Sequence, residues 1–206
     1  MAAFTLTPSQ TLSSALIGPR AHSVFVSIML VLGGSLLIAA SAQLALRLPI
    51  SPVPITGQTF AVLIVGMALG SRLGALAALT YLAEGMFLPV FAEFRTWAHP
   101  FTLWTAGYLV GFVGAAWLTG WLAERGWDRR PVSTAAAMLL GNVVIYIPGT
   151  LWLGYMYAAN TDFAGIALVS VVAIKGFAHF LIGDALKLGL ALLAFPAAWR
   201  WVQRNR

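Results

Sequence analysis

The chain is 206 residues long, 60% of its residues are hydrophobic, and only 9% carry charged side chains. A soluble domain of this size does not need so large an apolar fraction for its core, so the composition excludes a soluble fold and indicates an integral membrane protein. Cysteine is absent, which excludes disulfides, thiolate metal sites and cysteine nucleophiles.

Six windows with few or no ionisable side chains follow one another along the chain. The first, residues 24–46, contains none and exceeds the roughly 20 residues that a helix needs to cross a bilayer. It is too long for the apolar region of a cleaved signal peptide, and no A-x-A-like site follows it, so we interpret it as a retained first span. The other windows are residues 54–71, 73–90, 96–123, 131–160 and 163–199. The pattern predicts an all-α fold, an integral membrane bundle of six transmembrane helices.

The second and third windows are short for spans. Only "LGSRLG", residues 69–74, separates them, and Glu84 interrupts the third, so we expect each helix to cross tilted or incompletely. No linker or soluble domain stands out. The chain is therefore predicted to consist of a polar cytoplasmic tail, residues 1–23, and a single six-helix membrane domain, residues 24–206.

The basic residues predict the orientation, because cytoplasmic loops carry an excess of Lys and Arg. With six spans and the amino terminus inside, eight of the 12 basic residues face the cytoplasm, three lie outside and one lies in the membrane. The cytoplasmic set is Arg20, Arg72, Arg125, Arg129, Arg130, Arg200, Arg204 and Arg206; Arg47, Arg95 and Lys175 lie outside, and Lys187 lies in the membrane. We expect a multi-pass protein of the cytoplasmic (inner) membrane with both termini inside. Since the positive charge is spread over helix ends that face anionic lipid, nucleic-acid binding is not expected.

Asp184 and Lys187 lie three residues apart in the last apolar window. If Arg200 marks the cytoplasmic surface, Asp184 lies about 24 Å away, near the outer end of the span. The last helix is then expected to begin around Gly183, with Asp184 in its first turn, where the helix dipole favours an anion. Residues 163–182 become an apolar connector on the outer side, partly helical or re-entrant, rather than a seventh span.

This pair has two interpretations. Residues three apart share a helix face, so the two side chains can form a structural ion pair that caps the helix. Alternatively they form a ligand site, because ionisable residues inside a membrane are costly and tend to line cavities or pathways. A carboxylate beside an ammonium suits a neutral solute with adjacent N–H and C=O groups.

Further polar residues complete the set of candidate substrate-binding residues. Arg95, in the predicted outer loop "FAEFRTWAHP", could clamp a carboxylate or pair with Glu93 or a lipid headgroup. Gln58, Asn142 and Tyr146 lie in apolar windows, where hydrogen bonds between helices are the commoner role, and we group them with Tyr81 as candidates.

Several chemistries are not expected. No G-x-x-x-x-G-K-[ST] motif is present, so any ATP hydrolysis must occur on another chain. The three histidines lie in separate segments and suggest no metal cluster. Gly183-Asp184 is reminiscent of an intramembrane aspartyl protease, but that chemistry needs two carboxylates at one site, and only Glu84 is available as a partner. We predict neither an enzyme nor a bound cofactor.

Small residues recur every fourth position in two of the windows. They are Gly66, Gly70 and Gly74, and then Gly107, Gly111, Ala115 and Thr119. This spacing predicts closely packed helices. Ser35 and Ala39 form a weaker pattern of the same kind, which could also serve a partner helix.

The stretch "SPVPITGQTFAVLIVGMALGSRLGALAALTYLAEGMFLPVFA", residues 51–92, resembles the core pattern of the BioY family, the biotin-binding S components of energy-coupling-factor (ECF) transporters. "TAGYLVGF", "VVIYIPGTLWL" and "GDALK" follow in the order of the family. The sequence departs from the family where residues 93–99 replace a usually glycine-rich stretch, and where Trp104, His179 and Ile182 replace prolines. We therefore expect the outer connector to be more helical than in relatives.

The resemblance implies six membrane helices, cytoplasmic termini and a biotin site near the outer surface. The ureido ring of biotin would meet Asp184 and Lys187, and Arg95 occupies the loop that would meet its carboxylate. The implied partners are biotin, the lipid membrane, and a T-type membrane subunit with ATPase subunits, or further copies of the chain if it transports alone. The alternatives are an S component for another vitamin and a membrane scaffold or assembly protein in which the Asp184–Lys187 pair is structural.

Overall fold

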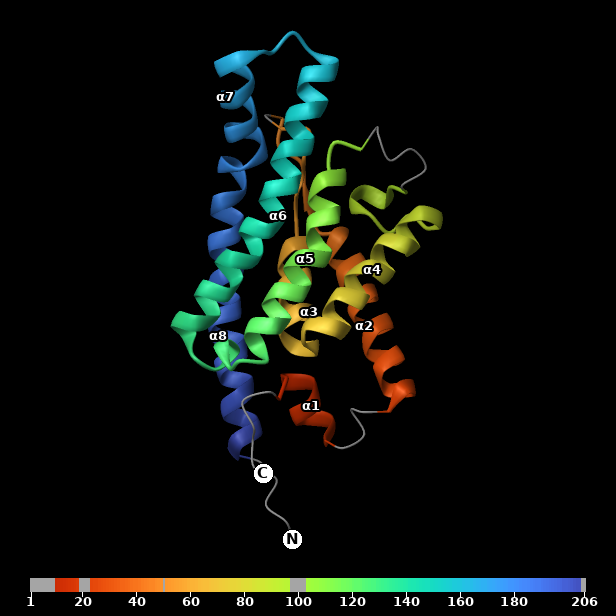
Figure 1. The fold of residues 1–206 in the computed structure, drawn as a ribbon, viewed down its shortest axis with the longest axis vertical. Helices are drawn as coiled ribbons and strands as arrows, with labels where there is room; N and C mark the ends of the chain where they lie inside the picture. The colour runs from red at the N-terminus through yellow and green to blue at the C-terminus, as the bar shows by residue number, and fades with distance from the viewer. Residues whose placement is uncertain (1–9, 19–22, 50, 97–102, 205–206) are drawn as a thin grey trace.

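The computed structural model describes residues 10–18, 23–49, 51–96 and 103–204, and it is almost entirely helical (Figure 1). The α-helices are α1 (Leu12–Ile17), α2 (Val24–Ala42), α3 (Gln58–Leu69), α4 (Ser71–Phe87), α5 (Ala106–Ala123), α6 (Pro131–Asn160), α7 (Gly165–Gly176) and α8 (Leu181–Arg204). Two short strands, β1 (Ala45–Leu46) and β2 (Ile55–Thr56), pair antiparallel, and 3₁₀ turns cover Ala92–Phe94, Trp127–Arg129 and Ala178–Phe180. The described parts of both terminal segments lie at one end of the bundle.

Six helices, α2 to α6 and α8, occupy the six predicted spans, which confirms the all-α membrane bundle. In the described residues, α2, α5, α6 and the continuous stretch Gly165–Arg204 are long and apolar enough to cross a membrane. Large apolar side chains such as Leu36, Leu151 and Leu193 are exposed on the outside of the bundle. This is the surface expected of a protein whose helices face lipid, and the chain is a multi-pass membrane protein.

Helices α3 and α4 form the short hairpin that the sequence predicts, with 12 and 17 residues. Gly70 makes the turn between them with a φ of 90°, which a residue with a side chain rarely adopts. The carboxylate of Glu124 caps α4, because its Oε1 accepts hydrogen bonds from the backbone N–H of Ser71 at 2.7 Å and from its hydroxyl at 2.8 Å. The Glu124 carboxylate thus provides an acceptor for one of the N–H groups that have no partner within the first turn of α4.

The small-residue repeats lie at helix contacts, as expected. A side chain at Gly66 would meet the carbonyl oxygen of Ala116 at 2.4 Å, and one at Gly107 would meet that of Pro148 at 2.2 Å. These glycines allow α3 and α6 to approach α5, the central helix of the bundle (Figure 1). Ser35 and Ala39 are also buried, and Ser35 donates a hydrogen bond to Glu84 of α4, so this face of α2 packs inside the chain. Glu84 therefore pairs with Ser35 and not with Asp184.

The predicted connector, residues 163–182, is mostly helical. Its helix α7 has 12 residues, or about 18 Å, too short to cross about 30 Å of hydrocarbon. Figure 1 shows that α7 lies beside the far half of α6 and that α8 continues in nearly the same direction. Helix α8 begins at Leu181, two residues before the predicted start. Hydrogen bonds from Tyr108 to the carbonyl oxygen of Gly176 and from Ser51 to that of Lys175 hold the connector on the bundle.

A carboxylate is buried at the end of the bundle where α1 packs on the last turns of α8. Asp128 is fully buried and accepts a hydrogen bond from the indole N–H of Trp199 at 2.6 Å, while the guanidinium of Arg129 lies 4.5 Å from the centre of a Trp199 ring. Trp199 also packs on Ala15 of α1, so part of the predicted tail is a helix docked on the bundle. Residues 1–9 and 19–22 of that tail, with Arg20, and Arg206 at the other end lie outside the described residues.

Candidate ligand-binding site

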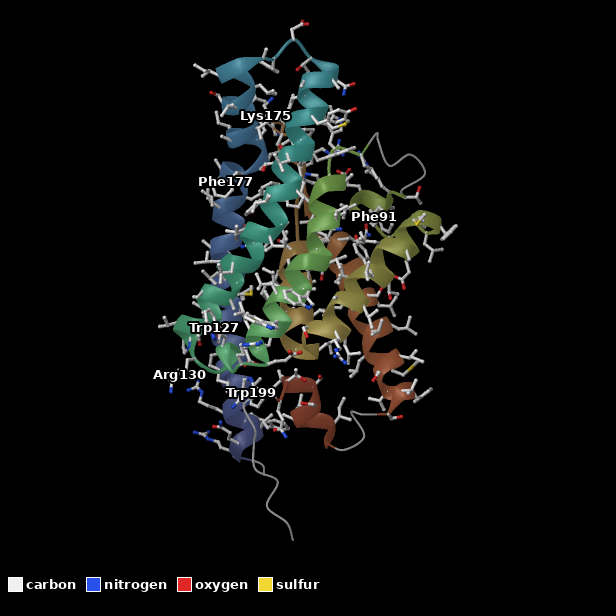
Figure 2. All side chains as sticks on the ribbon, in the orientation of Figure 1. Phe91, Trp127, Arg130, Lys175, Phe177 and Trp199 are labelled. Atoms are coloured by element: carbon white, nitrogen blue, oxygen red, sulfur yellow. The ribbon has the colours of Figure 1, made fainter. Side chains whose placement is uncertain are left out.

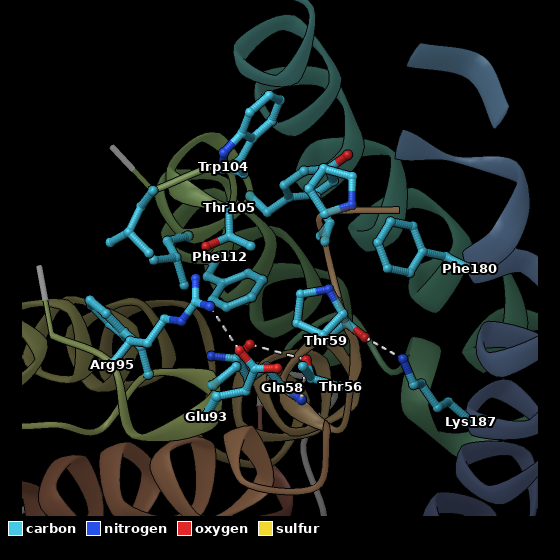
Figure 3. Close-up of a pocket in the computed structure, with 18 residues that line it drawn as sticks. Thr56, Gln58, Thr59, Glu93, Arg95, Trp104, Thr105, Phe112, Phe180 and Lys187 are labelled. Carbon is cyan, nitrogen blue, oxygen red and sulfur yellow. Dashed lines mark hydrogen bonds and ion pairs between the residues drawn. The ribbon is translucent and has the colours of Figure 1, made fainter. Parts of the chain in front are cut away.

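A pocket opens where four segments that are distant in sequence converge (Figure 3), in the half of the bundle where Phe91 lies (Figure 2). Residues 52–59 run into α3, residues 91–95 follow α4, residues 103–112 lead into α5, and the fourth segment contributes Phe180 and Lys187. The lining residues are Pro52, Val53, Pro54, Thr56, Gln58, Thr59, Phe91, Ala92, Glu93, Arg95, Leu103, Trp104, Thr105, Tyr108, Leu109, Phe112, Phe180 and Lys187.

Lys187 supplies the charge at one end of the pocket. Its Nζ lies 3.1 Å from Oδ1 of Asp184 and donates to Oγ1 of Thr59 at 2.8 Å. The Asp184 and Lys187 side chains are only 10% and 16% exposed, so this is a largely buried ion pair. Because α8 begins just before Asp184, the spacing of three residues places both side chains on one helix face, as predicted. Lys187 lines the pocket, whereas Asp184 lies behind it.

Tyr146 joins this pair from α6. Its hydroxyl donates to Oδ2 of Asp184, so both carboxylate oxygens have a partner. The Tyr146 ring packs near Phe180 and Tyr108, with ring centres 5.9 Å and 6.4 Å away. These contacts fix the orientation of Asp184, which in turn holds Lys187 at the pocket wall. Tyr146, a predicted substrate-binding residue, is not one of the described residues that line the pocket, and its direct contact with a ligand stays a prediction.

Gln58 and Tyr81 form a second buried polar group. Gln58 lines the pocket at the start of α3, accepts from Thr56 at 3.0 Å and donates to the hydroxyl of Tyr81. That hydroxyl donates to the carbonyl oxygen of Val90 at 3.3 Å. Tyr81 is fully buried behind Gln58 and ties α4 to the segment that leads into the pocket loop.

Asn142, another predicted site residue, lies away from the pocket lining. It lies on α6 one turn before Tyr146 and is half-buried, and it is not one of the described residues that line the pocket. Its role as a ligand residue stays a prediction.

Arg95 stands across the pocket from Lys187 (Figure 3). It follows the 3₁₀ turn Ala92–Phe94, which is closed by a hydrogen bond of 3.1 Å from the backbone N–H of Phe91 to the carbonyl oxygen of Arg95. The guanidinium of Arg95 lies 3.1 Å from a carboxylate oxygen of Glu93, one of the alternatives that the sequence left open. Arg95 is about half exposed, so it can still meet a ligand. Residues 97–102, which include the rest of the predicted loop, lie outside the described residues.

Sequence reasoning missed several residues of the pocket. Thr59 was not singled out, although it follows Gln58 directly and its hydroxyl faces Lys187. The apolar wall was also missed; it is formed by Phe91, Trp104, Tyr108, Phe112 and Phe180. Two of these aromatic residues lie in "TAGYLVGF" four positions apart, which places them on one helix face, and this spacing is the signal that could have identified them.

The arrangement suits an elongated amphiphilic molecule. Lys187 and Thr59 lie at one end and the guanidinium of Arg95 at the other, and Gln58 and aromatic side chains complete the lining. In the described residues, no group of three or more His, Asp or Glu side chains could hold a metal ion. The cavity itself measures only about 50 Å³, far below the roughly 300–1,000 Å³ of typical ligand pockets, so a ligand must separate the walls to enter.

Comparisons with known proteins identify the family and the fold of the chain. The model of the BioY family matches residues 11–204. A biotin transporter BioY from Rhizobium etli is 34% identical over 77% of this chain and 93% of its own length, and one from Thermotoga maritima is 36% identical over 72% and 82%. The crystal structure of the S-component for biotin from an ECF-type ABC transporter superposes with a TM-score of 0.70 at 19% identity, covering 85% of this chain and 92% of that one.

Proposed function

The chain belongs to the BioY family, and from this premise we propose that it captures biotin at the outer face of the cytoplasmic membrane as the S component of an ECF-type transporter. The observation that carries the proposal is that Lys187 and Arg95 stand at opposite ends of one pocket with an aromatic wall between them. Biotin has the matching order of groups, a ureido ring, an apolar ring and chain, and a carboxylate.

At the Lys187 end, the ureido carbonyl is a suitable acceptor for the ammonium. Lys187 uses two of its donors on Asp184 and Thr59, and an ammonium has three. The ureido N–H groups can donate to Thr59 or to the oxygen of Gln58, both in the lining. Asp184 does not line the pocket and already has a partner on each carboxylate oxygen, so it acts mainly by fixing Lys187, which differs from the direct contact suggested by its spacing alone.

At the Arg95 end, a guanidinium can hold the carboxylate of biotin with two parallel hydrogen bonds. Because this residue is carried by a loop, and because the cavity is too narrow for the ligand, we propose that the loop of residues 91–95 moves outward to admit biotin and then closes over it. Ligand binding would in this way order the outer side of the protein.

The sequence contains no nucleotide-binding motif, so any ATP hydrolysis that drives release into the cell must occur on another chain. We propose that a T-type membrane subunit with two ATPases tilts the loaded S component until its site faces inward, or that copies of this chain associate and transport alone. In either case both termini lie in the cytoplasm, as the distribution of basic residues predicts.

The test is equilibrium binding of radiolabelled biotin to the purified chain, since all the proposed contacts come from one polypeptide. Saturable high-affinity binding is expected, and its absence in a folded sample would contradict the proposal. Uptake is measured separately in cells that produce only this chain. Binding without accumulation would favour the route through ATPase subunits, and accumulation would favour solitary transport.

A further inference from the structure

Glu93 brings an acidic group into the wall of a pocket proposed to take an acid. Its carboxylate is shared by two arginines, Arg95 from its own loop and Arg47 from the segment after β1, 46 residues earlier. An unshared Glu93 would neutralise Arg95 and repel an incoming carboxylate. Whether the pocket accepts an anion therefore depends on which arginine pairs more strongly with the Glu93 carboxylate.

The Glu93 carboxylate pairs more extensively with Arg47 than with Arg95. Arg47 binds both carboxylate oxygens, with Nε 2.7 Å from Oε1 and a second nitrogen on Oε2, whereas Arg95 reaches Oε2 alone at 3.1 Å. Forked pairing of this kind is the stronger arrangement. The hydrogen bond from Arg47 is also the largest cause of the lowered pKa of Glu93, and the charge of Arg95 is the smallest of the causes. Arg95 thus keeps donors for another partner.

The turn that carries Glu93 has an unusual backbone conformation and is anchored near Arg47. Glu93 and Phe94 have φ values of 61° and 57°, a left-handed conformation that non-glycine residues adopt only when their surroundings impose it. Gln43 at the end of α2 supplies part of that constraint, because its amide donates to the carbonyl oxygens of Val90 and Phe91 and accepts from the N–H of Phe94. The turn that carries Glu93 is therefore anchored to the same segment that carries Arg47.

We propose that Arg47 is a specificity-determining residue that never touches the ligand: it neutralises Glu93 and so leaves the charge of Arg95 for the carboxylate of the ligand. This inference rests on the proposed function, because it concerns selection at the same site. Two arginines and one carboxylate leave one positive charge at this end of the pocket, which an acid ligand then balances. Without Arg47 the end becomes neutral, and an acid loses its electrostatic advantage.

The experiment compares biotin with its neutral carboxamide on the full-length chain. For Arg47→Met we expect biotin affinity to fall about three- to fivefold at low salt, the scale of a partly exposed ion pair, while carboxamide affinity changes less than twofold. Glu93→Gln removes the negative charge from the pocket wall and should tighten biotin binding. The double variant restores a single positive charge on Arg95 and should recover biotin affinity. The Arg47→Met effect should shrink in about 0.5 M salt, where charges are screened within a few ångströms.

Two further variants separate charge from structure. Arg47→Lys should restore most of the preference for biotin, and Arg125→Met, which removes one positive charge at the opposite end of the bundle, should leave the preference intact. Equal weakening of biotin and carboxamide by Arg47→Met, or a loss of biotin binding in Glu93→Gln, overturns this inference while wild-type binding stands. A wild-type chain that binds neither compound overturns the proposed function itself.

Discussion

The Asp184–Lys187 pair allows a ligand site to be distinguished from a structural ion pair. Lys187→Met keeps the apolar stem and removes the ammonium, and Asp184→Asn keeps the shape while removing the negative charge. Since Lys187 lines the pocket, its loss removes a charge-assisted hydrogen bond worth about 1.5–3 kcal/mol, or roughly ten- to more than a hundredfold in biotin affinity. Asp184 does not line the pocket and acts by positioning Lys187, so we expect Asp184→Asn to lower biotin affinity by up to about tenfold.

Stability should follow a different pattern from affinity. The two side chains are 10% and 16% exposed, and removing one partner of a buried pair strands the other, at a cost of about 3–5 kcal/mol. Lys187→Met should approach that loss. Asp184→Asn should cost less, because the amide oxygen can still accept from Tyr146 or Lys187. The double change to Asn and Met removes both charges and should recover much of the stability.

The assay is biotin affinity measured beside thermal stability in detergent for the two single variants and the double variant. A ligand site predicts a double variant that is folded and binds poorly. A structural pair predicts that affinity recovers together with stability, so a well-folded double variant with unimpaired biotin affinity would refute the assignment.

Three other outcomes follow from the described residues. Burial raises the pKa of Asp128 to about 6 from 3.8. Between about pH 4 and 6 the native chain therefore binds more protons than the unfolded chain, so its free energy of unfolding falls as the pH rises through that window. The loss is about 3 kcal/mol in all. Asp128→Asn should raise the melting temperature at pH 7.5 and flatten its pH dependence, and an unchanged pH profile would contradict this. Gly107→Ala forces a Cβ to within 2.2 Å of backbone and should cost about 1–3 kcal/mol, whereas Gly189→Ala, where a Cβ meets nothing within 4 Å, should be neutral; equal losses would argue against close packing there. Reporter fusions should place both ends of the chain in the cytoplasm, and an external carboxyl end would make residues 163–182 a true span.

The helices were predictable because their causes are local. Long windows without charge need a helix to satisfy their backbone groups in lipid, and this requirement gives the bundle without any knowledge of packing. Helix geometry alone then places Asp184 and Lys187 together. Small residues every fourth position likewise predicted close contacts, and a side chain at Gly66 or Gly107 would indeed collide with a neighbouring helix.

The rest of the site depends on contacts that no local rule supplies. Thr59 meets Lys187 across 128 residues, and Tyr146 meets Asp184 across 38. Periodicity says which face of a helix is apolar, but in a bundle apolar on nearly all sides it does not say which helix lies opposite. For this reason Asn142 and Tyr146, four residues apart on one face, could not be separated, although only Tyr146 reaches the charged pair.

The Arg95 end of the pocket was the hardest to predict, and the reason lies in the loop after α4. Glycine would tolerate a left-handed turn without strain, whereas here Glu93 and Phe94 adopt that conformation. Glu93 places a negative charge beside Arg95, which by itself would oppose an acid ligand. Arg47 offsets it from 46 residues away, and that pairing follows from neither the motif nor the spacing, only from the fold that brings the end of α2 to the loop after α4.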